Sequence, residues 1–305
     1  KSIIDIIKET GVAIWNKKDK YWEVPNTYLA FLLDNLTYFD DIDLVLEEDK
    51  SKEDILSPKL TYKVQPFPHQ LDGIKKGINS SAWLLLDEPG LGKTAQVIHI
   101  AEELKEQEGI HHCLIICGIN SLKNNWEKEI KFHSDLDSII IGKKINSKGK
   151  ITTLSIKDRA EQLLGDIKEF FIILNIESMR DERIVYAINS RSDIEMCVVD
   201  EVHKIKGTDS IQSINLCKAN NFKYKIGLTG TLLLNTPLDT YVPLTWLGLE
   251  NSTITNVKAE YCVYSIYKEL VGYKNLEILK ELIDDNSLRR TKDLLTLPPK
   301  TVINE

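Results

Sequence analysis

The sequence lacks any long uninterrupted apolar stretch. Its longest apolar runs, such as residues 170–174, have the length of a β-strand, whereas a membrane-spanning helix needs about 20 apolar residues. The N-terminal segment carries Lys1, Asp5, Lys8 and Glu9 among its isoleucines, so it also lacks the apolar core of a signal peptide. We therefore expect a protein with no membrane partner.

The chain also lacks an excess of basic residues. Its 305 residues include 39 Lys and Arg against 46 Asp and Glu, for a formal net charge of −7. This balance excludes a protein that binds its partners through a generally basic surface, but it allows a local basic groove. With 42% hydrophobic and 28% charged residues, the composition excludes wholesale disorder and is typical of globular domains.

Cysteines are few, and none of them forms a CxxC pair. Cys113 and Cys117 lie four positions apart on a predicted strand, hence on one face, which favours buried packing over a metal site. The total of five is odd, and it favours a protein whose thiols stay reduced. We expect a cytoplasmic location, in a bacterial or phage-type protein rather than a nuclear one.

Composition changes near residues 55–65 and marks a domain boundary. Acidic residues dominate 34–54, and three prolines follow at Pro58, Pro66 and Pro68. Before the boundary, the aromatic residues of 15–22 and the apolar pattern of 28–36 predict a strand pair and a helix. We expect residues 1–60 to form a small α+β accessory domain, and residues 61–300 to form the main domain.

The main domain alternates apolar runs with helical patterns. The runs bear few polar residues, as expected for strands that are covered on both faces of a parallel sheet. The predicted strands are 82–86, 113–117, 138–141, 170–174, 196–199 and 224–228. The predicted helices include 94–107, 121–132, 157–168 and 210–220, whereas the chain after Pro243 looks helical and irregular. This alternation predicts an α/β fold with three layers and a mainly parallel central sheet.

The strongest motif is DEPGLGKT, residues 87–94, between a predicted strand and a predicted helix. In this setting, glycines let backbone N–H groups close around phosphate, and the helix N-terminus adds partial positive charge. Lys93 can then reach the β- and γ-phosphates, and the Thr94 hydroxyl can bind Mg²⁺. The general phosphate-loop pattern has glycine where this chain has Asp87, so the alternative is a glycine-rich turn with a solvated lysine.

A second motif is DEVH, residues 200–203, at the end of the strand 196–199. Parallel α/β sheets bind ligands at the carboxyl ends of their strands. Asp200 can therefore hold the Mg²⁺ that Thr94 also binds, and Glu201 can orient and deprotonate a water molecule. The alternative is an acidic helix start with His203 solvated or packed.

Together these motifs resemble those of the Swi/Snf-type DNA translocases, within the superfamily 2 helicase-like ATPases. That group also carries aspartate at the position of Asp87. The similarity extends along most of the chain from Phe67. NNWEKEI at 124–130, NIE at 175–177 and LTGT at 228–231 resemble further family motifs, and SLRRTKDLLTLPPK at 287–300 resembles the end of the first lobe. At Gly118, however, the chain has glycine where the family usually has proline.

The resemblance implies a RecA-like lobe that binds ATP and Mg²⁺, together with roles for individual residues. Gln70 would read adenine, and Pro89, Gly90, Leu91, Gly92, Lys93, Thr94 and His203 would line the nucleotide site. Lys93, Asp200 and Glu201 would be catalytic, with Thr94 and Asp200 as Mg²⁺ ligands. Thr229, Gly230 and Thr231 would couple nucleotide state to DNA contact. Asn125, Trp126, Asn175 and Glu177 are the candidate DNA contacts, whereas Arg289 and Arg290 would pair with acids and are assigned no catalytic role.

The implied activity is ATP hydrolysis coupled to movement on duplex DNA. The sequence has no initiator Met, and only residues 301–305 follow LPPK. We therefore expect part of a longer protein, in which 301–305 begin a linker to a second lobe. Two alternatives remain open: a strand-separating superfamily 2 helicase acting on DNA or RNA, and a non-enzymatic module that binds partners according to its nucleotide state.

Overall fold

The computed structural model describes most of the chain. It covers residues 56–145, 151–219, 221–230 and 236–294, with Ile4, Ile6, Ile7, 14–16 and 21–23 of the N-terminal segment. Its contacts divide the chain into two units, Lys1–Asp54 and Ile55–Glu305. Residues 56–60, assigned above to the first domain, hydrogen-bond within the second unit. The Leu56 amide donates to Asn79 Oδ1 at 2.8 Å and the Lys59 amide to Glu103 Oε1 at 2.9 Å.

The first unit contains the strand pair that the sequence predicts. Strands β1 (Ile14–Asn16) and β2 (Tyr21–Glu23) pair antiparallel, with Trp15 opposite Trp22. The helix expected at 28–36 lies outside the described residues.

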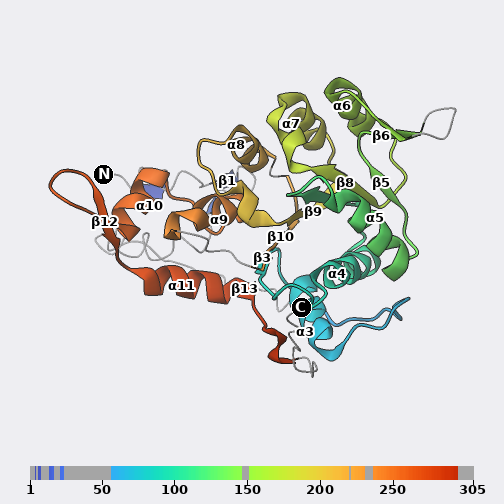
Figure 1. Cartoon of the computed structure of the whole chain (residues 1–305), viewed down its shortest axis with the longest axis horizontal. Coiled ribbons are helices and arrows are strands. Elements are labelled where there is room, and N and C mark those ends of the chain that lie inside the picture. The colour runs from blue at the N-terminus through green and yellow to red at the C-terminus, as the bar shows by residue number, and fades with distance from the viewer. Residues whose placement is uncertain are drawn as a thin grey trace, which may run out of the picture. The chain divides into compact units, whose positions relative to one another are not determined.

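A parallel sheet forms the centre of the second unit. Among the described residues, seven strands lie in the order β13–β3–β10–β9–β4–β8–β5, and neighbouring strands pair in parallel (Figure 1). They are β3 (Ala82–Leu85), β4 (His112–Cys117), β5 (Ser138–Ile140), β8 (Phe171–Asn175), β9 (Ile194–Asp200), β10 (Tyr224–Leu228) and β13 (Ser287–Leu288). The six predicted strands are confirmed, whereas the two-residue β13 was not predicted.

The apolar strands bury side chains on both faces of this sheet. Leu84 and Leu114 belong to one buried cluster, whereas Trp83 and Cys113 belong to the other. Because successive side chains of a strand point to opposite faces, a sheet covered twice requires apolar residues at every position. This requirement explains the continuous apolarity of the sequence.

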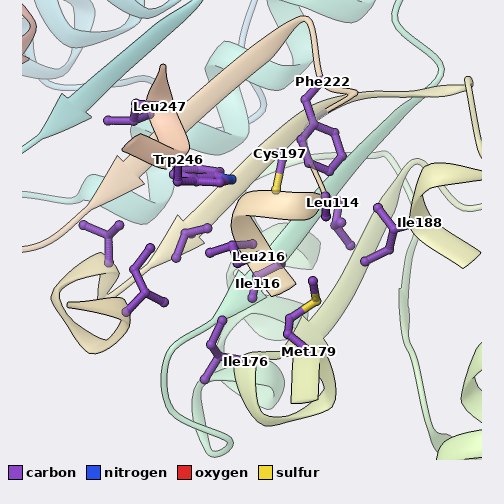
Figure 2. Close-up of a cluster of buried hydrophobic side chains, with 14 of the residues drawn as sticks. Leu114, Ile116, Ile176, Met179, Ile188, Cys197, Leu216, Phe222, Trp246 and Leu247 are labelled. Atoms are coloured by element: carbon purple, nitrogen blue, oxygen red, sulfur yellow. The ribbon is translucent and has the colours of Figure 1, made fainter. Parts of the chain in front are cut away.

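Helices cover the two faces and complete the three-layer fold. Helices α3 (Pro68–Ile78), α4 (Lys93–Glu108) and α5 (Leu122–His133) pack on one face. The other is covered by α6 (Ile156–Leu164), α7 (Glu182–Asn189), α8 (Ile211–Lys218), α9 (Tyr241–Leu247), α10 (Ile254–Tyr261) and α11 (Leu276–Asp285). Figure 2 shows part of this second core, where Trp246 and Leu216 approach Cys197 of β9. Helix α6 ends at Leu164, before the predicted residue 168, and Gly165 follows it with an extended backbone.

Two antiparallel hairpins extend from this framework, and neither was predicted. Strands β6 (Lys143–Ile145) and β7 (Ile151–Thr153) form the first, and β11 (Cys262–Tyr264) and β12 (Leu270–Tyr273) form the second. Within the described ranges, every helix is too short or too polar to span a bilayer. All five cysteines are free, and Cys113 and Cys117 are fully buried, as predicted.

Candidate functional site

The phosphate loop connects β3 to α4, as the sequence predicts. Gly90 and Gly92 adopt positive φ angles of 94° and 74°, a conformation that glycine adopts without strain. Pro89 and Gly90 are exposed, whereas Leu91 is buried beneath them. Gly92 is the N-cap of α4. The loop therefore presents its backbone to solvent at the start of a helix, as phosphate binding requires.

Lys93 is the first residue of α4, and its side chain lies back over the loop. Its Nζ donates to the backbone oxygen of Asp87 at 2.7 Å. Burial lowers the pKa of Lys93, and the carboxylates of Glu201 and Asp200 oppose this effect. Thr94 follows as a half-buried residue. A partly desolvated cation thus lies close to the acidic motif.

Asp200 ends β9, separated from β3 by the single strand β10. Its Oδ1 accepts from the Glu201 amide at 2.9 Å, and its Oδ2 accepts from Trp126 Nε1 at 2.8 Å. Burial raises the pKa of Asp200, and the bond from Trp126 acts in the opposite direction. Both hydrogen-bond donors are neutral, so the carboxylate is oriented without being paired to a cation by these bonds.

Glu201 and His203 link the acidic motif to the residues after β10. Glu201 has a left-handed backbone, with φ of 53° and ψ of 50°, a strained conformation that is common at functional sites. His203 Nδ1 lies 3.2 Å from Glu201 Oε2 and 2.9 Å from Thr229 Oγ1. Burial lowers the pKa of His203, against the effect of Glu201. Through His203, the carboxylate and the Thr229 hydroxyl are connected.

Gly230 brings the same segment against the phosphate loop. A Cβ atom at Gly230 would lie 3.0 Å from Pro89 Cδ. Thr229 is buried, and Thr231 lies outside the described residues. Of the three predicted coupling residues, two therefore lie between the loop and the acidic motif.

Gln70 is 7% exposed, and its amide is bonded to the protein at both ends. Its Oε1 accepts from the Phe67 amide at 2.9 Å, and its Nε2 donates to the Leu91 carbonyl at 3.4 Å. The side chain thus caps the start of α3 and contacts the phosphate loop. Its predicted role as the reader of adenine stays a prediction.

The structure separates the four candidate DNA contacts. Trp126 is 1% exposed and hydrogen-bonds to Asp200, so the indole is enclosed in the core beside the acidic motif, and its contact with DNA stays a prediction. Asn175 is also buried, and its amide donates to Glu177 Oε2 at 2.6 Å. Asn125 and Glu177 are exposed. They stay candidates for contact with DNA.

Sequence reasoning missed two cations near Glu177. Arg159 of α6 donates to Ser178 Oγ at 3.0 Å. Burial lowers the pKa of Lys123, as does the charge of Arg159, whereas Glu177 raises it. The sequence analysis singled out neither residue, and they lie 36 positions apart, so no local signal could have found the pair.

Gly118, the departure from the family pattern, contacts the acidic motif directly. Its amide donates to the Asp200 backbone oxygen at 2.9 Å. A proline has no N–H to donate, so glycine adds a bond at this position that the usual residue could not make.

With this geometry established, the model of the SNF2-related domain matches residues 27–304. The chain belongs to this family. The predicted resemblance to Swi/Snf-type proteins and the predicted RecA-like fold are thereby confirmed. The SNF2-related domain here is 30% identical over 268 residues to the bovine (Bos taurus) DNA annealing helicase and endonuclease ZRANB3, covering 83% of this chain and 23% of that protein. It is 27% identical to the DNA repair and recombination protein RAD54-like of Drosophila persimilis, covering 76% of this chain and 32% of that one.

A solved structure agrees with this assignment. The SWI2/SNF2 ATPase core of Sulfolobus solfataricus in complex with dsDNA matches with a TM-score of 0.59 and 25% identity. The match covers 78% of this chain and 47% of that chain. The SNF2-related domain described here therefore spans less than half of the length of each of these three relatives.

Proposed function

We propose that this SNF2-related domain is the ATP-binding part of a DNA-dependent ATPase that moves along duplex DNA. The observation that carries the proposal is the convergence of two motifs at the carboxyl edge of the sheet. The phosphate loop follows β3, and the Asp200–Glu201 pair lies at the end of β9. The carboxylates of both acids raise the pKa of Lys93 against the effect of its burial. A triphosphate held by the loop would extend toward these acids.

Each residue has a role that its chemistry supports. The exposed backbone of Gly90–Gly92 would bind the phosphates, and Lys93 would exchange its bond to Asp87 for one to the β- and γ-phosphates. Thr94 and Asp200 offer the oxygen ligands that Mg²⁺ prefers, so the residues fit this ion. When bound, Mg²⁺ would neutralise charge on the phosphates. Glu201 would orient and deprotonate the attacking water.

The relatives of this chain support the part of the proposal that concerns DNA. The solved SWI2/SNF2 ATPase core is in complex with dsDNA. In this chain, Asn125 and Glu177 are exposed candidates, and the cations Lys123 and Arg159 lie near Glu177. We propose that this edge contacts one backbone strand, with an affinity that falls as salt rises. Because the chain covers 47% of the solved core, we also propose that turnover requires a second lobe.

Nucleotide binding tests the proposal on the 305-residue chain itself. Titration calorimetry with Mg–ATP should give binding to the wild type and at least about tenfold weaker binding to Lys93→Ala, a difference of about 1.4 kcal/mol. The apo melting temperature should stay within about 2 °C, because a loop lysine contributes little to the core. Lys128→Ala is the matched control, since Lys128 is an exposed lysine on α5. Equal affinity of the wild type and Lys93→Ala would contradict the assignment.

The DNA part of the proposal needs the full-length parent protein. Its ATPase rate should rise with blunt duplex DNA, and Glu201→Gln should abolish that rise. Stimulation by single strands alone would favour a strand-separating helicase. An unchanged rate in Glu201→Gln would contradict the role of this residue.

A further inference from the structure

The phosphate loop is held by a segment that lies about two hundred residues further along the chain. The Leu86 amide donates to the Leu288 carbonyl at 2.8 Å, and the Glu88 amide donates to the Arg290 carbonyl at 3.0 Å. The Lys292 amide in turn donates to Glu88 Oε2 at 2.9 Å. Residues 288–292 thus continue alongside the chain from β3 into the first residues of the loop.

The side chain of Arg290 joins three parts of the site. Its Nε donates to Asp87 Oδ1 at 2.9 Å, and one terminal nitrogen, Nη2, donates to Gln96 Oε1 at 2.6 Å and to Asp87 Oδ2. The other, Nη1, donates to the His69 carbonyl. Asp87 is fully buried, and the Arg290 side chain is 11% exposed. We call these four residues the Arg290 clasp.

The clasp reaches both ends of the loop. At the start, the backbone oxygen of Asp87 accepts a hydrogen bond from the ammonium group of Lys93. At the far end, Gln96 Nε2 donates to Asp87 Oδ2 at 3.1 Å and to the Leu91 carbonyl at 3.4 Å. Arg290 therefore holds both Asp87, whose backbone oxygen binds Lys93, and Gln96, whose side chain binds the backbone of the loop.

Helix α3 packs closely against the Arg290 clasp. A Cβ atom at Gly73 would lie 1.9 Å from Gln96 Oε1 and 3.1 Å from the Nη2 atom of Arg290. Helix α3 can approach only because residue 73 has no side chain. The same helix carries Gln70, which also contacts the Leu91 carbonyl.

We propose that Arg290 is a positioning residue of the nucleotide site, which sets the phosphate loop for a nucleoside triphosphate through Asp87 and Gln96. This inference rests on the proposed function. Arg290 does not touch the phosphates; it fixes the conformation in which the loop receives them. It also explains why this chain has aspartate where the general phosphate-loop pattern has glycine: Asp87 is the carboxylate that Arg290 binds.

Four substitutions in the 305-residue chain test the proposal. Arg290→Ala removes the clasp, Arg290→Lys keeps the charge without the bidentate geometry, and Asp87→Asn removes the charge of its partner. Arg289→Ala is the matched control, because Arg289 is exposed and has no ion pair within the described residues. The Kd for Mg–ATP is measured by calorimetry at a temperature at which circular dichroism shows each variant to be folded. Hydrogen exchange of the 87–92 amides is measured without nucleotide.

The expected Kd is raised at least tenfold in Arg290→Ala and less in Arg290→Lys, with no change in Arg289→Ala. The double variant Asp87→Asn/Arg290→Lys should bind no more weakly than the weaker single variant, because both act through one contact. Exchange of the 87–92 amides should be faster in Arg290→Ala than in the wild type. If Arg290→Ala does not fold, Arg290→Lys and the double variant decide.

Two results would overturn the inference. One is a folded Arg290→Ala, or Arg290→Lys in its place, with a lower melting temperature but the Kd of the wild type. The other is unchanged exchange of the 87–92 amides, which shows a loop that does not need the clasp. If the wild type binds no Mg–ATP, the proposed function fails, and exchange alone decides whether Arg290 positions the loop.

Discussion

Two aspartates at the carboxyl edge of the same sheet are held in opposite ways. Asp87 follows β3, is fully buried and receives a bidentate guanidinium from Arg290. Asp200 ends β9, is partly accessible and receives one indole N–H and one backbone N–H. The first carboxylate has its charge neutralised by the protein, whereas the second has only its orientation set.

This difference separates a structural acid from one available to a ligand. A buried carboxylate with a cation attached has little to offer a metal ion. Burial raises the pKa of Asp200, and the charge of Lys93 only partly opposes this effect, so a divalent cation at this carboxylate would be favoured. We therefore expect Mg²⁺ to bind beside Asp200 rather than beside Asp87, and the substitutions below test how the acids of this protein are held.

The largest effect is expected for Asp87→Ala, which leaves the guanidinium of Arg290 buried without its carboxylate. Breaking a buried ion pair costs about 3–5 kcal/mol, so the free energy of unfolding in urea should fall by that amount. Asp166→Ala, at an exposed acid, is the control and should change little. A loss below about 1 kcal/mol would be too small for a buried ion pair, and would show that the Asp87–Arg290 pair does not stabilise the fold.

Trp126→Phe tests the donor to Asp200 and keeps most of the ring. The Asp200 carboxylate loses one hydrogen bond, with an expected cost of about 1–3 kcal/mol in chemical unfolding. Trp83→Phe is a close control, because Trp83 is equally buried and its Nε1 has no partner among the described residues. If both substitutions cost the same, the indole bond to Asp200 contributes nothing.

Asp200→Asn should separate stability from metal binding. Asparagine can still accept one of the two hydrogen bonds, and no paired cation is left behind, so apo stability should change by less than about 1 kcal/mol. Chelation of Mg²⁺ should weaken ATP binding by about tenfold in the wild type, worth about 1.4 kcal/mol, and hardly at all in the variant. Equal sensitivity of both proteins to the chelator would remove Asp200 from the metal site.

The smallest effect concerns Asp193, an acid that is paired at the surface. The hydrogen bonds from Arg191, at 2.9 and 2.6 Å, hold the pKa of Asp193 below its ordinary value. Because the pKa is lower in the folded chain than in the unfolded chain, the pair stabilises above about pH 4 and is lost as the pH falls through the folded pKa. In Asp193→Asn, the free energy of unfolding should fall less on acidification than in the wild type, by a difference of less than about 1 kcal/mol. Identical slopes between about pH 5 and pH 3 would contradict this.

The sequence predicts best what depends on neighbouring residues. Continuous apolar runs located six of the seven strands of the central sheet, because a strand covered on both faces cannot hide polar side chains. Helix α3 escaped the pattern because Gly73 and Gly77 interrupt it. Both glycines lie where a Cβ would collide with α4, with Gln96 and Ile100 respectively. The hairpin β11–β12 escaped because its exposed side chains follow no pattern of burial.

The candidate site divides along the same line. Short motifs identified Lys93, Thr94, Asp200 and Glu201, whose spacing is local to one loop or one strand end. The partners of the two aspartates lie 203 and 74 positions away, at Arg290 and Trp126. Only the sheet brings these residues together, so a motif could suggest a DNA contact for Trp126 but could not show that the core encloses it.

The short strand β13 also covers a sheet edge through which copies of the protein could associate. Its segment accepts the amides of Leu84, Leu86 and Glu88, which face away from the rest of the sheet. Without residues 286–290, these amides would form an open edge, and open edges pair with strands of other molecules. The residues that order the phosphate loop thus also oppose aggregation. We expect a chain shortened before Asn286 to self-associate, and this loss should exceed the loss from weaker nucleotide binding.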